Sequence, residues 1–225
     1  MSKMTDKSIA QQVWSEIDED IILRRALERE IISLKNLAVY LIKKRKLSAT
    51  LDAVISAIRR YHQESNLEKK YEKARSIIAQ SQDIRVTSNI VSIAIEKNKQ
   101  TQEQLQKVFD KIEYEKGEIL LIIQGEQSIK VMINEKNKEK VLSYFPKNKI
   151  LSIEEDIAEI NIQLAEKAVD TPGIIVALST ELMVHDINVV ETMSCVPEML
   201  FFVKQKDVVK SYEILFNLCK IKKEK

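Results

Sequence analysis

A short loop near the C-terminal end has the residue types that bind a small charged ligand. Asp170-Thr171-Pro172-Gly173 precedes a predicted helix that begins near Ile174. Gly173 has no Cβ, so the chain can turn tightly there and bring backbone N–H groups close to a ligand carboxylate. Pro172 fixes φ at the entry to the helix, and the first turn presents unpaired N–H groups and a positive dipole end. The pattern predicts an anion-binding loop.

Two polar residues beside this loop carry complementary groups. The Asp170 carboxylate can accept hydrogen bonds from a ligand ammonium group. Asn188, at the head of the next predicted strand, offers both a donor and an acceptor. The structural alternative is that Asp170–Gly173 is only a strand-to-helix turn and Asn188 only a turn residue.

A second candidate site is a group of cations near the N-terminus. Lys43-Lys44-Arg45-Lys46 form a turn between two amphipathic segments, and Arg59 and Arg60 lie near the end of the second. From Ile31 to His62 there are seven cations against Asp52 alone, seven minus one or +6, in a chain of net charge +2. Such cations can neutralise phosphates, which predicts salt-sensitive DNA binding. The alternative is a solvated helix end whose cations favour the C-terminal dipole.

Other kinds of site are not expected. The three glycines lie far apart, whereas phosphate loops and dinucleotide fingerprints need several glycines close together. His62 and His185 are the only histidines, and Cys195 and Cys219 form no closely spaced pair, so a zinc site is not expected. No nucleophile–base constellation is recognised. We therefore expect a protein that is not an enzyme and that uses no metal or cofactor.

Composition sets the broad class. The 225 residues are 44% hydrophobic and 31% charged, which is typical of a globular chain. The net charge of +2 predicts no bulk attraction to nucleic acid or membrane, so such a role must come from local clustering. No run reaches the ~18 apolar residues of a membrane span, and the N-terminus lacks the apolar core of a signal peptide. Two cysteines make a poor disulfide framework, which favours a reducing cytoplasm.

The loop lies within a βαββα pattern. An apolar run at 157–164 predicts the first strand, and a hairpin of Val189–Ser194 and Met199–Lys204 turns through Cys195-Val196-Pro197. This order, with a loop glycine at the first strand-to-helix junction, resembles the ACT domain. That domain is the regulatory amino-acid-sensing fold of aspartate kinases and related metabolic enzymes. The resemblance covers roughly residues 157–219 and is strongest over Asp170–Asn188.

The resemblance implies a ligand and a set of site residues. ACT ligands often bind between paired units and touch the first loop of one unit and the second strand of the other. By resemblance, an amino-acid ligand would contact Asp170, Thr171, Pro172, Gly173, Ile174 and Asn188. Many ACT-like units serve only as dimerisation surfaces, so both readings stay open. The catalytic domain that precedes the ACT domains of aspartate kinases has no counterpart here.

An earlier segment repeats the same order of elements. Strand-like residues begin at Asp83, and a polar helix is predicted over Thr101–Tyr114. Two strands then flank Gly125-Glu126-Gln127, and a short helix leads to a further strand at Lys149–Ile153. The pattern predicts βαββαβ.

We therefore expect tandem ACT-like units, a first repeat at 83–153 and a second repeat at 154–225. The first repeat has Asn98-Lys99-Gln100-Thr101 at the loop position, without Pro or Gly, so its ligand site is degenerate. The second repeat ends soon after its second helix. Its fourth strand is missing, too short (Lys220 to Lys225), or donated from elsewhere.

Residues 1–65 are predicted to be helical. Two amphipathic helices joined by a short turn are compatible with a helix-turn-helix module, and either Ser48 or Thr50 caps the second of them. Trp14 beside an apolar helix face is expected in the core. Residues 66–82 are predicted as a connecting helix that packs on its counterpart in a dimer, because its apolar residues form one stripe: Leu67, Tyr71, Ala74 and Ile78.

The expected fold is α+β: an N-terminal helical bundle, helix-turn-helix-like, followed by two ferredoxin-like βαββαβ ACT units. Phe201-Phe202 alternates faces of a strand, so one ring is expected to face a partner sheet, which predicts a homodimer through the ACT-like sheets. The leading hypothesis is a cytoplasmic, non-enzymatic regulator that senses an amino acid, binds DNA and has no membrane partner. The alternative is an interaction module that docks on a metabolic enzyme. One solvent-facing cation surface would favour DNA; cations that are split or paired internally would favour the module.

Overall fold

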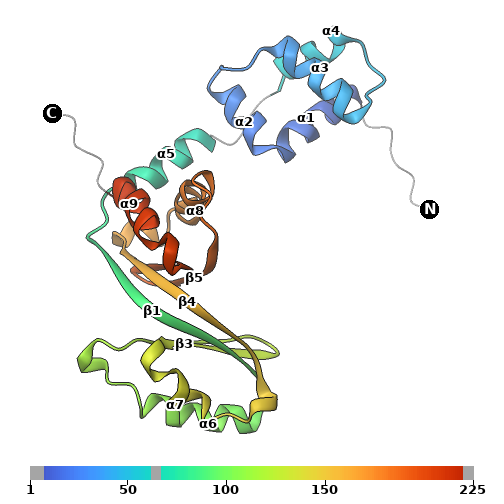
Figure 1. Ribbon diagram of the computed structural model, residues 1–225. Coiled ribbons are helices and arrows are strands. Elements are labelled where there is room, and N and C mark those ends of the chain that lie inside the picture. The colour runs from blue at the N-terminus through green and yellow to red at the C-terminus, as the bar shows by residue number, and fades with distance from the viewer. Residues whose placement is uncertain (1–7, 62–66, 220–225) are drawn as a thin grey trace, which may run out of the picture. The chain divides into compact units, whose positions relative to one another are not determined.

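The computed structural model describes residues 8–61 and 67–219. The chain forms two compact units, an N-terminal unit of Met1–Lys73 and a C-terminal unit of Ala74–Lys225 (Figure 1). Their division falls inside a helix, between Lys73 and Ala74. The described part of the N-terminal unit is helical, and the C-terminal unit combines helices with one sheet, so the predicted α+β class is confirmed.

Short amphipathic helices build the N-terminal unit: α1 (Ile9–Glu19), α2 (Ile21–Glu28), α3 (Leu34–Arg45) and α4 (Leu51–Arg59). Thr50 caps α4, because its hydroxyl accepts a hydrogen bond from the Ala53 N–H at 3.3 Å. Of the two predicted caps, Thr50 is therefore the one that is used. Trp14 packs against the core of this unit and donates its indole N–H to the Ala57 carbonyl at 2.9 Å, as expected of a core residue.

Helix α5 (Leu67–Ile78) begins in the N-terminal unit and ends in the C-terminal unit. Ala74 and Ile78 on its apolar stripe are fully buried, and the Arg25 guanidinium lies 4.1 Å from the centre of the Tyr71 ring. The stripe that was expected to face a second copy is thus largely covered within one chain.

One antiparallel sheet of six strands organises the C-terminal unit, in the order β2-β3-β1-β4-β6-β5. Two 14-residue strands, β1 (Asp83–Glu96) and β4 (Ile150–Gln163), lie at its centre. A hairpin flanks each of them: β2 (Leu120–Gln124) with β3 (Ser128–Asn134), and β5 (Val189–Cys195) with β6 (Glu198–Lys204). Both hairpins lie where the turn residues predicted them.

Each long strand serves both repeats. β3 pairs with the second part of β1, Ile90–Glu96, and β6 pairs with the second part of β4, Ile157–Gln163. The first part of β1, Asp83–Thr87, pairs with the end of β4 and takes the place of a fourth strand there. The fourth position of the second half-sheet is therefore filled by the strand that opens the first repeat. β4 also runs through the predicted junction at 153/154.

Asn89 and Asp156 mark corresponding positions in the two long strands. Each has φ 57°, in the left-handed region, and each directly precedes the buried part of its strand. From Ile90 and from Ile157 onward, the two strands have the same order of buried and half-buried residues. The backbone and the burial pattern both support an internal duplication.

Apolar cores form on both faces of the sheet. On the outer face, helices α6 (Lys99–Phe109) and α7 (Lys138–Leu142) cover the first repeat. On the inner face, a second core joins both repeats: Ile90, Met132, Ile157, Leu200 and Phe202. The sheet curls around this inner core, and an ion pair between Lys130 on β3 and Glu191 on β5 joins strands that are far apart in the strand order.

The curl corrects the interpretation of Phe201-Phe202. Both rings are fully buried within a single chain, and Phe202 packs in the inner core. The expectation that one ring faces a partner sheet is wrong, because the inner face of the sheet closes on itself. The sequence pattern shows that both faces of this strand are apolar. It does not show that a single chain buries both of them.

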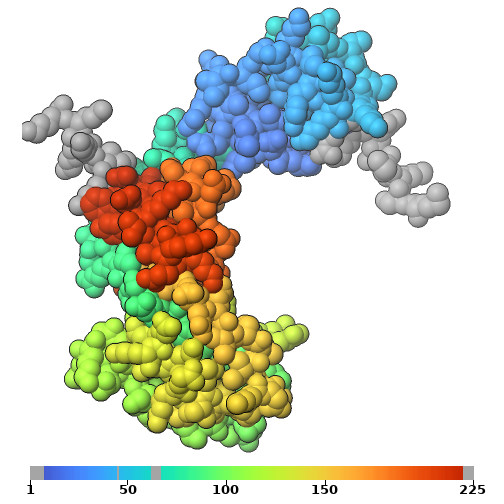
Figure 2. Space-filling model, viewed as in Figure 1, coloured from blue at the N-terminus to red at the C-terminus, as the bar shows by residue number. Residues whose placement is uncertain are grey.

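Helices α8 (Ile174–Val184) and α9 (Val208–Cys219) accompany the second repeat. The two repeats form one continuous surface in the space-filling view, the first green to yellow and the second orange to red (Figure 2). α6 ends at Phe109 rather than at the predicted Tyr114, and Phe109 is 47% exposed. Lys220 to Lys225, where a fourth strand would be too short, lie outside the described residues.

Candidate functional site

The connection from β4 to α8 is a folded loop, residues 164–173. It contains a 3-10 turn over Glu166–Ala168, and the buried Thr171 side chain stabilises it through a hydrogen bond. The Thr171 hydroxyl donates to the Lys167 carbonyl at 2.6 Å, and the Thr171 N–H donates to the Ala168 carbonyl at 3.2 Å. Thr171 is 7% exposed, so its polar groups are satisfied by the loop itself.

Gly173 is the N-cap of α8 and has φ 97°, a conformation that side chains with a Cβ rarely adopt. Its carbonyl accepts the first helical hydrogen bond, from Ala177 at 2.9 Å. No side chain caps this helix, and within the described residues the N–H groups of Ile174, Ile175 and Val176 have no hydrogen-bond partner. The N-terminus of α8 is therefore an open set of donors with a positive dipole end.

A cavity of about 430 Å³ opens at this helix end. The loop, the first turn of α8 and the tip of the β5–β6 hairpin line it. Most of its walls are apolar: Leu164, Ala165, Ala168, Val169, Pro172, Ile174, Ile175, Val176, Val196, Pro197 and Met199. Thr171 and Ser194 are the hydroxyl residues of the lining, and Glu198 is its one charged residue. An apolar cavity with a few polar groups is the usual form of a small-molecule site.

Glu198 is half-buried and held in place. Its Oε1 accepts a hydrogen bond from the Asn161 side-chain amide at 3.1 Å. Glu159, two positions before Asn161 on β4, is 6% exposed. Burial, with a smaller contribution from the nearby Glu198, raises the pKa of Glu159 to about 7. The second repeat therefore holds two nearby carboxyl groups, those of Glu159 and Glu198, which repel each other when both are ionised.

The structure brings four of the six predicted ligand residues together. Thr171, Pro172, Gly173 and Ile174 line the cavity. Asp170 is exposed and outside the lining, and Asn188 is exposed at the start of β5, next to the C-terminal end of α8. Within one chain, Asn188 and Gly173 thus lie at opposite ends of the same helix.

Sequence reasoning missed the hairpin side of the cavity. Val196 lies in the predicted β5–β6 turn, which was treated as a connection, and Ser194 and Glu198 flank that turn. The signal that was available is topological. In β-α-β-β order, the first loop and the hairpin turn lie at the same end of the strands, so a charged residue in that turn is a candidate for the site.

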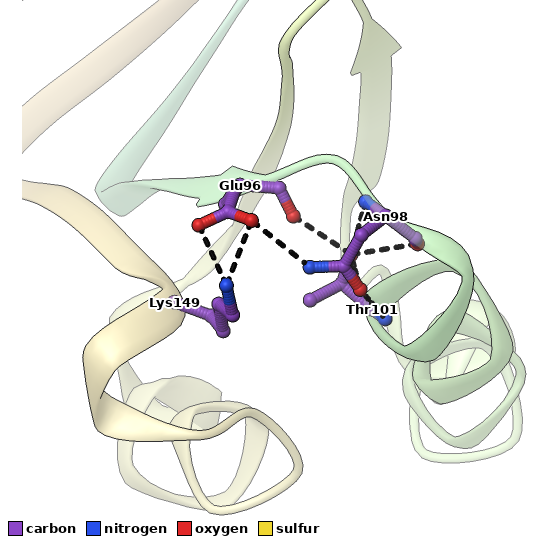
Figure 3. A network of polar contacts seen from close by, with 4 residues as sticks. All are labelled: Glu96, Asn98, Thr101 and Lys149. Carbon is purple, nitrogen blue, oxygen red and sulfur yellow. Dashed lines mark hydrogen bonds and ion pairs between the residues drawn. The ribbon is translucent and has the colours of Figure 1, made fainter.

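The corresponding helix end in the first repeat has a side-chain cap. α6 starts directly after Asn98, whose side chain accepts from the Thr101 N–H at 3.0 Å, while the Thr101 hydroxyl accepts from the Asn98 N–H at 3.0 Å. This capping box occupies the Thr101 N–H, the counterpart of the Val176 N–H that stays open in α8. Lys149 and Asn98 also bind the Glu96 carboxylate, which lowers the pKa of Glu96 (Figure 3). The prediction of a degenerate first site is consistent with this geometry.

The predicted nucleic-acid residues fall into two groups. Lys43 and Lys46 are exposed at the end of α3, and Lys44 lies 3.8 Å from the Asp20 carboxylate. Arg59 and Arg60 are exposed at the far end of α4, roughly 12 Å along the helix from its start. The Arg45 side chain lies outside the described residues. The cations are thus split and one is paired with an acid, the arrangement that was set out as favouring the interaction module.

Across residues 8–61 and 67–219, no group of three or more His, Cys, Asp or Glu side chains is placed to hold a metal ion. None of the helices in these ranges is long and apolar enough to cross a membrane.

Comparison with known proteins shows the fold of the chain. No family model and no curated protein matches it. Among solved structures, the aspartate kinase of Clostridium acetobutylicum matches with 17% identity and a TM-score of 0.51 over 62% of this chain. The aspartokinase alpha and beta subunits match with 12% identity and a TM-score of 0.51, over 63% of this chain and 99% of theirs. The regulatory subunit of aspartate kinase from Thermus thermophilus matches with 12% identity and a TM-score of 0.50, over 62% of this chain and 98% of that one.

The matched region spans only 35% of the Clostridium enzyme but nearly all of the Thermus regulatory subunit. The structural neighbours are therefore regulatory regions rather than whole kinases. They support the ACT-like fold that the loop and strand order predicted.

Proposed function

We propose that this chain is a non-enzymatic regulatory protein whose second repeat binds an amino-acid-type ligand in the cavity beside Gly173. In this proposal the C-terminal unit is a pair of ferredoxin-like βαββαβ ACT units. The observation that carries it is the difference between two equivalent helix ends. α6 is closed by its own capping box, whereas α8 has no side-chain cap and opens onto the cavity.

The chemistry of the cavity selects the ligand. Three unpaired N–H groups at a positive helix end bind a carboxylate. The apolar lining accepts an aliphatic or thioether side chain, and the Glu198 carboxylate, oriented by Asn161, accepts hydrogen bonds from an ammonium group. The ligand class is thus an α-amino acid with an apolar side chain. Asp170 lies outside the lining, so Glu198 takes the role that the sequence assigned to Asp170.

A second copy of the chain would bring Asn188 to the site. α8 exposes Ile175, Val176, Met183 and Val184, each between 49% and 65%. These apolar pairs lie near opposite ends of the helix, with the small residues Ser179 and Thr180 between them. Two such helices packed antiparallel would match apolar with apolar and place Asn188 of the second copy beside the Gly173 loop of the first. The exposed apolar residues of α8, rather than the faces of the sheet, therefore support a homodimer.

DNA binding by the N-terminal helices, as a helix-turn-helix-like domain, stays a weaker second candidate. The split of Lys43–Lys46 from Arg59–Arg60, and the Lys44–Asp20 pair, favour a domain that contacts protein instead. Selection of genomic fragments at two salt concentrations decides between them. Sequence-specific enrichment would establish DNA binding, and enrichment no higher than non-specific background would end it.

Titration calorimetry of the purified chain with each of the twenty amino acids tests the ligand proposal. We expect binding of one or more apolar amino acids, and a loss of roughly tenfold or more in affinity for Glu198→Gln, since a charged hydrogen-bond partner is lost. Glu126→Gln, in the exposed hairpin turn of the first repeat, is the matched control. Heats of dilution alone for all twenty would refute the proposal.

A further inference from the structure

The second half of α5 is in contact with both ends of α8. A Cβ built on Gly173 would lie 3.5 Å from the Ala74 Cβ, and Ala74 is fully buried. Toward the other end of α8, Arg75 Nη1 lies 2.6 Å from Glu181 Oε1. Helix α5 is therefore in contact with α8 at two places, at the N-cap beside the cavity and in the last turns of the helix.

The first turn of α5 is fastened to α2 by side chains. The Glu28 carboxylate accepts hydrogen bonds from the N–H groups of Leu67 at 2.8 Å and Glu68 at 2.6 Å, so Glu28 caps α5 from another helix. Arg25 Nε donates to Glu68 at 2.9 Å, and Arg29 pairs with the same carboxylate. The Arg25 guanidinium also lies over the Tyr71 ring.

We infer that α5 transmits the state of the Gly173 loop to α2. One continuous helix, Leu67–Ile78, joins the two sets of contacts. A change that orders or loosens the first turn of α8 alters the packing of Ala74. The change in α5 then reaches its first turn, where the Glu28 cap and the Arg25 contacts pass it to α2. The inference rests on the proposed function only for the identity of the natural trigger.

The route can be tested without any ligand. Gly173→Ala places a side chain at φ 97° and strains the loop directly. Hydrogen exchange of the full chain should be roughly tenfold faster in peptides covering 67–78 and 21–28. Gly117→Ala is the matched control, because Gly117 also has a left-handed φ, 74°, but a Cβ there would meet nothing within 4 Å.

Two outcomes would overturn the inference. In the first, exchange in Gly173→Ala rises only within 164–184 and is unchanged in α5 and α2. In the second, Gly117→Ala raises exchange in α5 and α2 as much as Gly173→Ala does, which would report general destabilisation.

Further variants locate the steps. Combining Glu28→Ala with Gly173→Ala removes the cap, so the response should persist in 67–78 and be lost in 21–28. Glu181→Ala, outside the cavity lining, should alter exchange in 67–78, whereas Glu213→Ala on the exposed face of α9 should not. An unchanged 67–78 in Glu181→Ala would contradict the Arg75 step.

A parallel titration with the twenty amino acids separates the two proposals. If none of them binds but Gly173→Ala still alters α5 and α2, the proposed function fails and the route stands. If one binds at saturation and leaves α5 and α2 exchange unchanged, the route fails and the proposed function stands.

Discussion

Ile90 of β1 pairs with Ile157 of β4, and each is the counterpart of the other in the internal duplication. The pair therefore lies on the approximate two-fold axis of the C-terminal unit. On either side of it, the start of one long strand completes the half-sheet that belongs to the end of the other. The two repeats are thus joined through their long strands, because the second half-sheet takes Asp83–Thr87 from the first repeat and β4 runs across the junction at 153/154.

The left-handed residues beside this axis can be tested by substitution. Asn89 has φ 57°, which Gly adopts freely and a β-branched residue does not. We expect Asn89→Gly to be near neutral and Asn89→Val to lower the free energy of unfolding by about 1–2 kcal/mol. Denaturant unfolding measures both variants. Equal stability of the two would mean that the backbone at this position relaxes.

Glu118 is expected to make the first repeat sensitive to acid. Its carboxylate accepts from the Glu113 N–H at 3.0 Å and from Asn137 at 2.9 Å, and it pairs with Lys136 at 2.7 Å. These contacts, the Glu113 N–H first, lower its pKa to about 2. The stabilisation is present above the unfolded pKa of about 4.3 and is lost as pH falls toward 2.

Glu118→Gln should accordingly be less stable than the parent at pH 7, and the gap should narrow below pH 4. Thermal unfolding across pH 2–7 measures this, with Glu115→Gln, an exposed residue of the same turn, as control. A gap that is constant with pH would show that the charge of Glu118 contributes nothing.

Glu159 should have the opposite effect. Its pKa is raised to about 7, so the folded chain holds a proton that the unfolded chain has released above about 4.3. Stability therefore falls as pH rises from about 4 to 7, and the deficit remains above pH 7. Glu159→Gln should be more stable than the parent by about 2–3 kcal/mol at pH 8 and equal to it near pH 4. A variant that is less stable at both pH values would contradict this account.

The capping box of α6 predicts that the first repeat does not share the ligand site. Asn98→Ala removes the side-chain cap and should cost about 1 kcal/mol of stability. Because the open helix end is that of α8, amino-acid affinity should not change. Weaker amino-acid binding in Asn98→Ala would place a ligand in the first repeat as well.

Local features of the chain were predictable because they depend on neighbouring residues. Alternating β-branched residues and turn signals predicted β1 and both hairpins, and Pro172-Gly173 predicted the start of α8. The glycine was informative because its left-handed φ is a local requirement.

Long-range features were not predictable. Asp83 at the start of β1 pairs with Gln163 at the end of β4. No local pattern specifies which strand fills this fourth position of the second half-sheet. The burial of Phe202 depends on the curl of the whole sheet, which brings Glu191 to Lys130. The place of Glu198 in the cavity lining was not predictable for the same reason. It depends on which end of the sheet the β5–β6 hairpin turns at, and not on the residues next to Glu198 in the sequence.

Amide NMR of the labelled chain tests the central claim most directly. Saturating L-leucine, L-isoleucine, L-methionine or L-phenylalanine should shift the N–H resonances of Ile174, Ile175 and Val176 downfield, with smaller shifts over 194–199. The N–H groups of Asn98 and Thr101 should stay unchanged, because they are already bonded. Shifts at Asn98 and Thr101, or none at Ile174–Val176 with any of the four amino acids, would contradict the assignment of the site.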